Sequence, residues 1–179
     1  MKKLLSLIVL GCLAAASFAQ TTATGFIDWV QNPTDFTYTI TLTNTGTTKI
    51  STLWYAWRPG QNYMTVSPTN VTGPAGWVIN ITHGAADGFA VRWNGAPNGV
   101  SLAAGASMTG FKFNSTMTPT ELAGNTPFFT NPPVGTTAIF ENAPFQGGTS
   151  ELNIQPVPEP ATLMALGLGG LALLRKRRR

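Results

Sequence analysis

The hydrophobic pattern is clearest in residues 36–44, which read Phe-Thr-Tyr-Thr-Ile-Thr-Leu-Thr-Asn. Every second residue is large and apolar, and threonines stand between them. A strand would therefore place the apolar side chains on one face and the hydroxyls on the other. Such strict alternation is typical of an antiparallel strand that is buried on one side only. The residues Asn44-Thr45-Gly46 then favour a turn.

Further short strands are predicted at intervals along the chain. They are Phe26–Gln31, Ser51–Trp57, Gly76–Thr82, Phe89–Trp93, Ser107–Asn114 and Thr136–Glu141. Glycine, proline and asparagine separate these segments, and no amphipathic helix of ten or more residues is visible between them. The pattern predicts an all-β fold, a single antiparallel β-sandwich of Ig-like or jelly-roll-like type, over residues 20–146.

Two stretches lack a clear strand pattern. Residues 116–135 contain four prolines and are expected to form a long loop with a short strand at Phe128-Phe129. Residues 147–157 are expected to be a spacer between the β domain and the C-terminal segment.

The first nineteen residues have the pattern of a secretory signal peptide. Lys2 and Lys3 precede an apolar run of 13 residues from Leu4 to Ala16, which is followed by the small-residue motif Ser17-Phe18-Ala19. We expect a signal helix, recognition by the Sec translocon, and cleavage by signal peptidase between Ala19 and Gln20. The alternative is lipidation at Cys12, but only seven apolar residues would precede that cysteine.

The C-terminal segment, residues 158–179, has three parts. Pro158-Glu159-Pro160 disfavours a helix, and residues 161–174 form an uncharged run of 14 residues. As a helix this run would be about 21 Å long, which is short against a hydrocarbon core of about 30 Å. The five cations Arg175, Lys176, Arg177, Arg178 and Arg179 then predict a cytoplasmic end.

This segment resembles the PEP-CTERM protein-sorting signal. The resemblance rests on Val157-Pro158-Glu159-Pro160-Ala161-Thr162, the Gly-rich Leu/Ala run and the arginine cluster. It implies a bacterial precursor that is held transiently in the inner membrane by a short transmembrane helix and is cut by an exosortase near Pro-Glu-Pro. The product would then reach the surface or the exopolysaccharide matrix of a Gram-negative bacterium. An ordinary single-span tail anchor is the alternative.

The β region has a second resemblance, to bacterial cellulose-binding modules with an Ig-like sandwich. It rests on the order of turn glycines and aromatic residues, including Leu42–Gly46, Pro59-Gly60, Trp77, Trp93–Gly95, and Leu102–Ser107 before Gly110–Ser115. In those modules exposed tryptophans stack on sugar rings. The resemblance implies a sandwich more strongly than it implies cellulose as the ligand.

The distribution of charge along the chain is more informative than its sum. The whole sequence has a net charge of +4, but seven of its eleven cations lie at the two ends. Residues 20–156 hold four cations and six acidic residues, a net charge of −2. This balance gives no reason to expect nucleic-acid binding.

The sequence indicates no catalytic residue, metal ligand set or cofactor. His83 is the only histidine and lies near Asp87 in an expected loop, where the pair is more typical of solvated polar residues. Glu121 and Glu141, or Asp87, could pair as glycosidase carboxylates, but their spacing does not support this. We therefore expect a protein that is not an enzyme, with a secreted hydrolase as a distant alternative.

Aromatic residues are the remaining candidates for function. In Trp54-Tyr55-Ala56-Trp57, alternation places Trp54 on one face and both Tyr55 and Trp57 on the other. Since both faces of one sandwich strand are rarely core, at least one large aromatic side chain could be exposed, but core packing is the more common outcome for any single tryptophan. Trp54, Trp57 and Tyr63 are the candidates for stacking on carbohydrate. The favoured hypothesis is a structural or adhesive β-sandwich, and the alternative is a carbohydrate-binding module for exopolysaccharide.

Overall fold

The computed structural model describes residues 20–84, 87–122, 136–142, 146–153 and 155–156. The expected signal helix, the expected C-terminal transmembrane helix and the expected strand at Phe128-Phe129 lie outside these residues. Within the part that is described, neither helix has the length and apolar character needed to cross a membrane.

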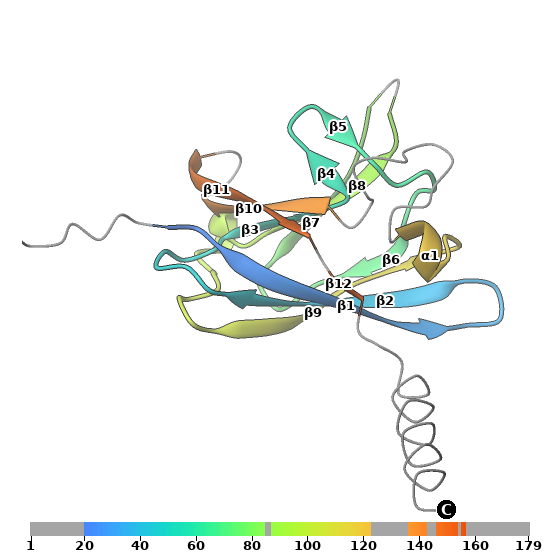
Figure 1. Cartoon of the computed structure of the whole chain (residues 1–179), viewed down its shortest axis with the longest axis horizontal. Coiled ribbons are helices and arrows are strands. Elements are labelled where there is room, and N and C mark those ends of the chain that lie inside the picture. Colours follow the sequence, from blue (N-terminus) through green and yellow to red (C-terminus); the bar gives the residue numbers. More distant parts are fainter. Residues whose placement is uncertain (1–19, 85–86, 123–135, 143–145, 154, 157–179) are drawn as a thin grey trace, which may run out of the picture.

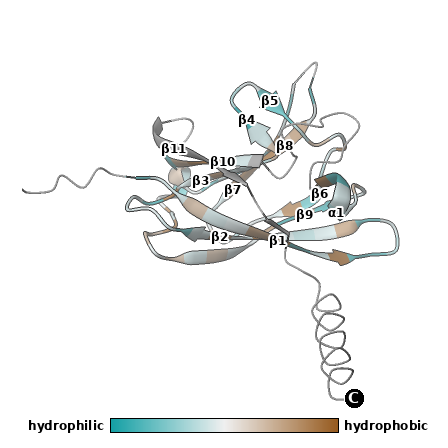
Figure 2. Cartoon of the chain, viewed as in Figure 1, coloured by the Kyte–Doolittle hydropathy of each residue, from teal (hydrophilic) through white to brown (hydrophobic). Residues whose placement is uncertain are grey.

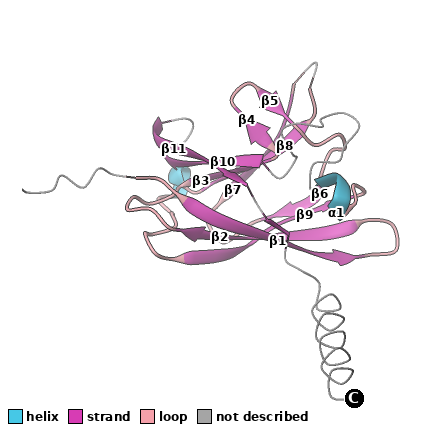
Figure 3. Ribbon diagram, viewed as in Figure 1, coloured by secondary structure: helices cyan, strands magenta, loops and turns pink. Residues whose placement is uncertain are grey.

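The fold consists of two β-sheets packed face to face (Figure 1). The first contains, in spatial order, β12 (Gln155–Pro156), β1 (Ala23–Gln31), β2 (Phe36–Asn44), β9 (Ser107–Ser115) and β6 (Thr69–Thr72). The second contains β11 (Gln146–Asn153), β10 (Thr136–Asn142), β3 (Thr52–Tyr55), β8 (Phe89–Asn94) and β7 (Val78–His83). A separate hairpin pairs β4 (Trp57–Arg58) with β5 (Gln61–Asn62), and the described helices are the short η1 (Ala96–Asn98) and α1 (Pro119–Leu122) (Figure 3).

The predicted all-β sandwich is confirmed, and each of the seven predicted segments contains a strand. The strand over Phe36–Asn44 has the bounds that its alternation predicts. The sheets are antiparallel as predicted except at one edge, where β12 runs parallel to β1 through Phe26–Gln155 and Ile27–Pro156.

The described residues of the segment expected to be a spacer, 147–153 and 155–156, lie in strands instead. They belong to β11, which pairs with β10, and to β12 at the edge of the first sheet. Local sequence could not show this, because an edge strand rich in glycine and polar residues is defined by the strand that it pairs with.

Alternation along the strands decides which side chains are buried. On β2, Tyr38, Ile40 and Leu42 are buried, whereas the threonines between them are partly exposed. On β1, Ile27 is buried while Phe26 and Asp28 on either side are exposed. Figure 2 shows hydrophobic and hydrophilic bands along β1, which do not follow burial there because apolar residues stand on both faces of this strand.

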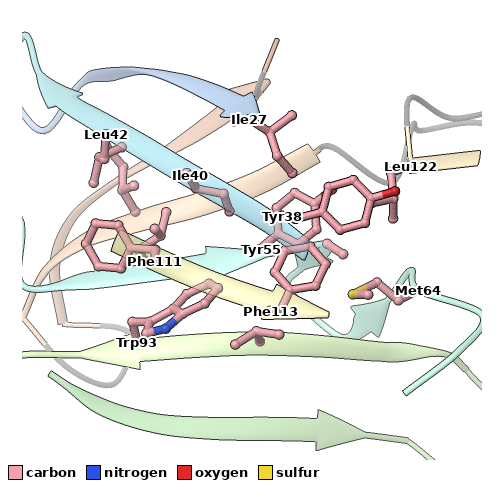
Figure 4. Close-up of a cluster of buried hydrophobic side chains, with 14 of the residues drawn as sticks. Ile27, Tyr38, Ile40, Leu42, Tyr55, Met64, Trp93, Phe111, Phe113 and Leu122 are labelled. Carbon is pink, nitrogen blue, oxygen red and sulfur yellow. The ribbon is translucent and has the colours of Figure 1, made fainter. Parts of the chain in front are cut away.

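Aromatic rings join the two sheets in the core (Figure 4). Phe113 of the first sheet packs at 5.1 Å from Tyr55 of the second, and Phe111 of the first packs at 5.6 Å from Trp93 of the second, measured between ring centroids. All four side chains are fully buried. Aromatic pairs at this spacing contribute beyond the area that they bury, by about 1 kcal/mol each.

A β-bulge at Gly110 allows the apolar side chains on both halves of β9 to point into the core. Ile40 pairs with Phe111 but the next residue, Thr41, pairs with Thr109, so Gly110 is the extra residue. Its φ of 98° is readily adopted only by glycine. The bulge places Phe111 inward and Thr109 outward, although a regular strand would put these two residues on the same face.

Tyr38 offers a test of the core. Its hydroxyl donates a hydrogen bond of 2.6 Å to the Met117 carbonyl, and both groups are buried. Tyr38→Phe leaves this carbonyl without its donor and should lower the free energy of unfolding by about 1–2 kcal/mol. Urea unfolding of residues 20–156 measures the change. Thr39→Val, which removes a hydroxyl one residue away on the outer face, is the control and should stay within about 0.5 kcal/mol. Equal effects of the two changes would contradict the assignment.

Candidate functional site

A second aromatic cluster lies on the outer face of the second sheet, on the side away from the core. It contains Trp54, Trp57, Ala90, Ala138 and Phe140. Trp54 is directed outward because its cross-strand partners are Arg92 and Ala138, whereas its neighbours Leu53 and Tyr55 belong to the core between the sheets.

Trp57 joins Trp54 because the chain turns at Ala56. Ala56 has a φ of 57°, a left-handed conformation that is rare for residues other than glycine. The alternation of β3 stops there, and Trp57 stacks on Trp54 with a centroid distance of 4.5 Å and an interplanar angle of 20°. The prediction that Trp57 and Tyr55 share a face is therefore wrong, since it assumed a regular strand through Ala56.

The three candidates for sugar stacking are all buried. The exposed fractions of Trp54, Trp57 and Tyr63 are 3%, 7% and 3%. Arg92 lies with its guanidinium carbon 5.3 Å from the centroid of the Trp54 ring, and Phe140 lies 6.0 Å from Trp57. Trp54 and Trp57 pack against each other and against Arg92 and Phe140, and none of the three candidates presents an open ring face for a sugar.

Tyr63 belongs to the core between the sheets rather than to the outer cluster. Its backbone N–H donates to the Ala56 carbonyl over 2.9 Å, and its hydroxyl donates to Gln61 Oε1 over 3.3 Å. The turn at Ala56 and the hairpin β4–β5 thus bring Trp57 to the outside of the second sheet and Tyr63 to the inside.

Asp87 fastens this hairpin to the connection between β7 and β8. Its carboxylate accepts hydrogen bonds from the backbone N–H of Asn62 (2.9 Å) and from the Asn62 side-chain amide (3.1 and 3.2 Å). Burial raises the pKa of Asp87, but these bonds and those from Gly84 outweigh it and lower the pKa overall. Thr82 donates to Asn62 Oδ1 over 2.9 Å and completes the junction.

His83 and Glu121, like Asp87, have structural contacts, whereas Glu141 lies in β10 and is partly exposed. His83 packs edge-on against Phe89 at 4.4 Å. Glu121 accepts from the backbone N–H and the hydroxyl of Thr118, while its own N–H donates to Thr118 Oγ1, a capping box at the start of α1. Among the described residues no three histidine, cysteine or acidic side chains are grouped as metal ligands.

The outer face of the first sheet is a broad polar surface. Its central residues, carried by β2 and β9, are Thr37, Thr39, Thr41, Thr43, Ser107, Thr109, Lys112 and Asn114. Cross-strand hydrogen bonds join Thr41 to Thr109 (2.9 Å) and Thr43 to Ser107 (2.7 Å). These bonds link hydroxyls across β2 and β9 on the outer face.

Phe26 and Val30 on β1 border this surface and are 48% and 63% exposed. The strand prediction includes Phe26 but not its exposure, because apolar residues stand on both faces of this strand. Phe26 and Val30 are on one face, and Ile27 and Trp29 are on the other. The signal that could have shown this exposure is Asp28. Asp28 lies on the same strand face as Phe26 and Val30, and its charged side chain indicates that this face is exposed to solvent.

The remaining predicted sites concern the two ends of the chain. Ala19, the motif Val157–Pro160 and the cations Arg175–Arg179 lie outside the described residues. Gln20 is described and exposed. Its backbone is hydrogen-bonded to the turn after β2.

Comparison with protein families finds the PEP-CTERM protein-sorting motif at residues 156–179. The resemblance noted in the sequence is thereby confirmed, and the motif implies an exported protein that is processed by an exosortase. No curated protein matches the chain significantly.

Among solved structures, two of the GH20 exo-β-N-acetylglucosaminidase from Vibrio harveyi are similar, one of an inactive mutant and one in complex with N-acetylglucosamine. Each matches with 13% identity and a TM-score of 0.46 over 76% of this chain. The match covers 18% of the enzyme.

The stacked tryptophans can be tested through stability. Trp57→Ala should lower the free energy of unfolding by about 3–5 kcal/mol, because it leaves a cavity against Trp54 and Phe140. Val30→Ala, at an exposed site, should change it by less than about 0.5 kcal/mol. Both are measured by urea unfolding. If Trp57→Ala proved as mild as the control, Trp57 would not be part of a packed cluster.

Proposed function

We propose that this chain is the precursor of a bacterial surface or matrix protein with a non-catalytic, structural or adhesive β-sandwich. It would be exported through the Sec translocon, cut by signal peptidase after Ala19, and held briefly in the inner membrane. An exosortase would then cut it near Pro158–Pro160 and release it to the cell surface or the exopolysaccharide matrix. The observation that carries this proposal is the PEP-CTERM motif at residues 156–179.

The position of the motif relative to the sandwich supports processing at the surface of a folded domain. β12 ends at Pro156, and Pro158 follows two residues later. Even fully extended, the chain from Pro156 to Pro160 spans at most about 14 Å. The exosortase would therefore work close to the first sheet. The pairing of β12 with β1 involves only two residue pairs and could open for cleavage at little cost.

A structural role is supported by the contacts of the acidic side chains. Asp35 accepts from Asn32 (2.6 Å) and Asn114 (2.9 Å), and these bonds lower its pKa. Asp87 accepts from Asn62, and Glu121 caps α1. In each case the carboxylate stabilises a turn, a junction or a helix start. A glycoside hydrolase would instead need two carboxylates that converge on one bond.

Processing is tested by the intact mass of the protein from its native host. We expect loss of residues 1–19 and truncation near Pro158–Pro160, because both segments have the pattern of removable signals. Glu159→Ala should block the second cut and leave a membrane-bound precursor with its basic end. Glu151→Ala, the same exchange outside the motif, is the control and should be processed normally. A wild-type product that still carries Arg175–Arg179 would refute the sorting proposal.

Carbohydrate binding is the second candidate, and the exposure of Phe26 beside ordered hydroxyls favours it. An aromatic ring can stack on a sugar, and threonine hydroxyls can both donate and accept hydrogen bonds. The exopolysaccharide of the host would be the ligand.

This candidate is tested by measuring binding of residues 20–156 to the host exopolysaccharide. Phe26→Ala should weaken binding at least about tenfold if the ring contributes 1.4 kcal/mol or more. Ile81→Ala, at a similarly exposed apolar site on β7 of the second sheet, is the control and should bind like wild type. Trp54→Ala and Trp57→Ala should act through stability. Absence of affinity in the wild-type domain would exclude this candidate and leave the structural role.

A further inference from the structure

Residues 20–22 are fastened to the turn that follows β2. The Gln20 carbonyl accepts from the N–H groups of Thr47 (2.9 Å) and Thr48 (3.2 Å). The Thr22 carbonyl accepts from Thr45 and Gly46, both at 3.0 Å. We refer to residues 20–22 and 45–48 together as the N-terminal clamp.

The clamp is closely packed. A Cβ atom on Gly46 would collide with the Gln20 carbonyl oxygen, so only glycine allows the approach. Thr21 is buried and its hydroxyl is hydrogen-bonded to that of Thr48 over 2.8 Å. The backbone of Gln20 is thus held in place, whereas the residue itself is exposed to solvent.

The nitrogen of Gln20 has one defined partner in this arrangement. It donates a hydrogen bond of 2.9 Å to Thr47 Oγ1. In the mature protein this nitrogen would become the α-amine if the chain is cut after Ala19, and the inference below rests on that part of the proposed function.

We propose that Gln20 is a modification site, where the mature N-terminus closes to a pyroglutamyl residue whose lactam N–H keeps the hydrogen bond to Thr47 Oγ1. The uncharged α-amine attacks Cδ of its own side-chain amide. A carbon–nitrogen bond forms and closes a five-membered lactam, the bond from Cδ to the amide nitrogen breaks, and that nitrogen leaves as ammonia with a proton from the α-amine. No oxidant, reductant or co-reactant is needed.

The geometry of the clamp is compatible with each part of this step. The α-amine has an ordinary pKa of about 7.7–8.0, so part of it is uncharged and nucleophilic at neutral pH. The Gln20 carbonyl takes no part in the reaction, so its bonds to Thr47 and Thr48 can remain. The lactam keeps a single N–H, which is the one donor that Thr47 Oγ1 receives in the structure.

The ring would leave the N-terminus without a charge and without a free amine. Aminopeptidases that require a free α-amine could not begin at residue 20. For a protein outside the cell, this would protect residues 20–22 of the N-terminal clamp from stepwise removal by such enzymes.

The test is mass spectrometry of the N-terminal peptide of the exported protein from its native host. A synthetic peptide of the same sequence, isotopically labelled and with an uncyclised glutamine, goes through the same work-up to measure ring closure during handling. We expect the host peptide to begin at residue 20 and to be lighter than the uncyclised peptide by one ammonia. Gln20→Asn is the matched control. It keeps the amide but would need a strained four-membered ring, so its peptide should keep its full mass.

The outcomes separate the two proposals. A peptide that begins at Gln20 with a free amine overturns the modification and leaves the signal cleavage standing. A peptide that begins at another residue overturns the cleavage position and the modification with it.

Thr47→Val tests the hydrogen bond independently. The ring should still form in this variant, but the lactam N–H should exchange with deuterium faster than in wild type. Equal exchange in the two proteins would overturn the assigned contact.

Discussion

The fold depends on the packing of two inner sheet faces through aromatic rings. Phe113 meets Tyr55 and Phe111 meets Trp93 across the interface, and all four are fully buried. The chain has a single cysteine, Cys12, which lies in the expected signal peptide, so the described residues contain no disulfide to assist this core. Burial of apolar area is therefore the main contribution that offsets the conformational entropy of the chain. The strict alternation on β2 is a direct consequence of this constraint.

Two local departures from strand geometry decide what lies on the outer faces. The bulge at Gly110 turns β9 so that Phe111 points inward and Thr109 joins the threonines of β2 outside. The left-handed Ala56 ends the alternation of β3 and places Trp57 against Trp54. The outer face of the first sheet is therefore polar along β2 and β9, whereas the outer face of the second sheet carries a buried aromatic cluster.

The two ends of the described chain are also part of the sandwich. Gln20 is held by the turn after β2, and β12 pairs with the edge of β1. The predicted signal cleavage site and the sorting motif thus adjoin structured residues at both ends. Under the processing proposed above, each cut would be made within a few residues of the folded domain.

The sequence by itself determined the all-β class, the bounds of β2 and the PEP-CTERM motif, because each depends on short-range order along the chain. Alternation needs only neighbouring residues, and a sorting signal is read as a linear segment. Tertiary structure alone decided the burial of Trp54 and Trp57, the exposure of Phe26 and the pairing of β12 with β1. A backbone turn at one alanine, or a partner strand more than a hundred residues away, leaves no periodic trace in the local sequence. Such features arise only when distant segments meet and their burial outweighs local preference.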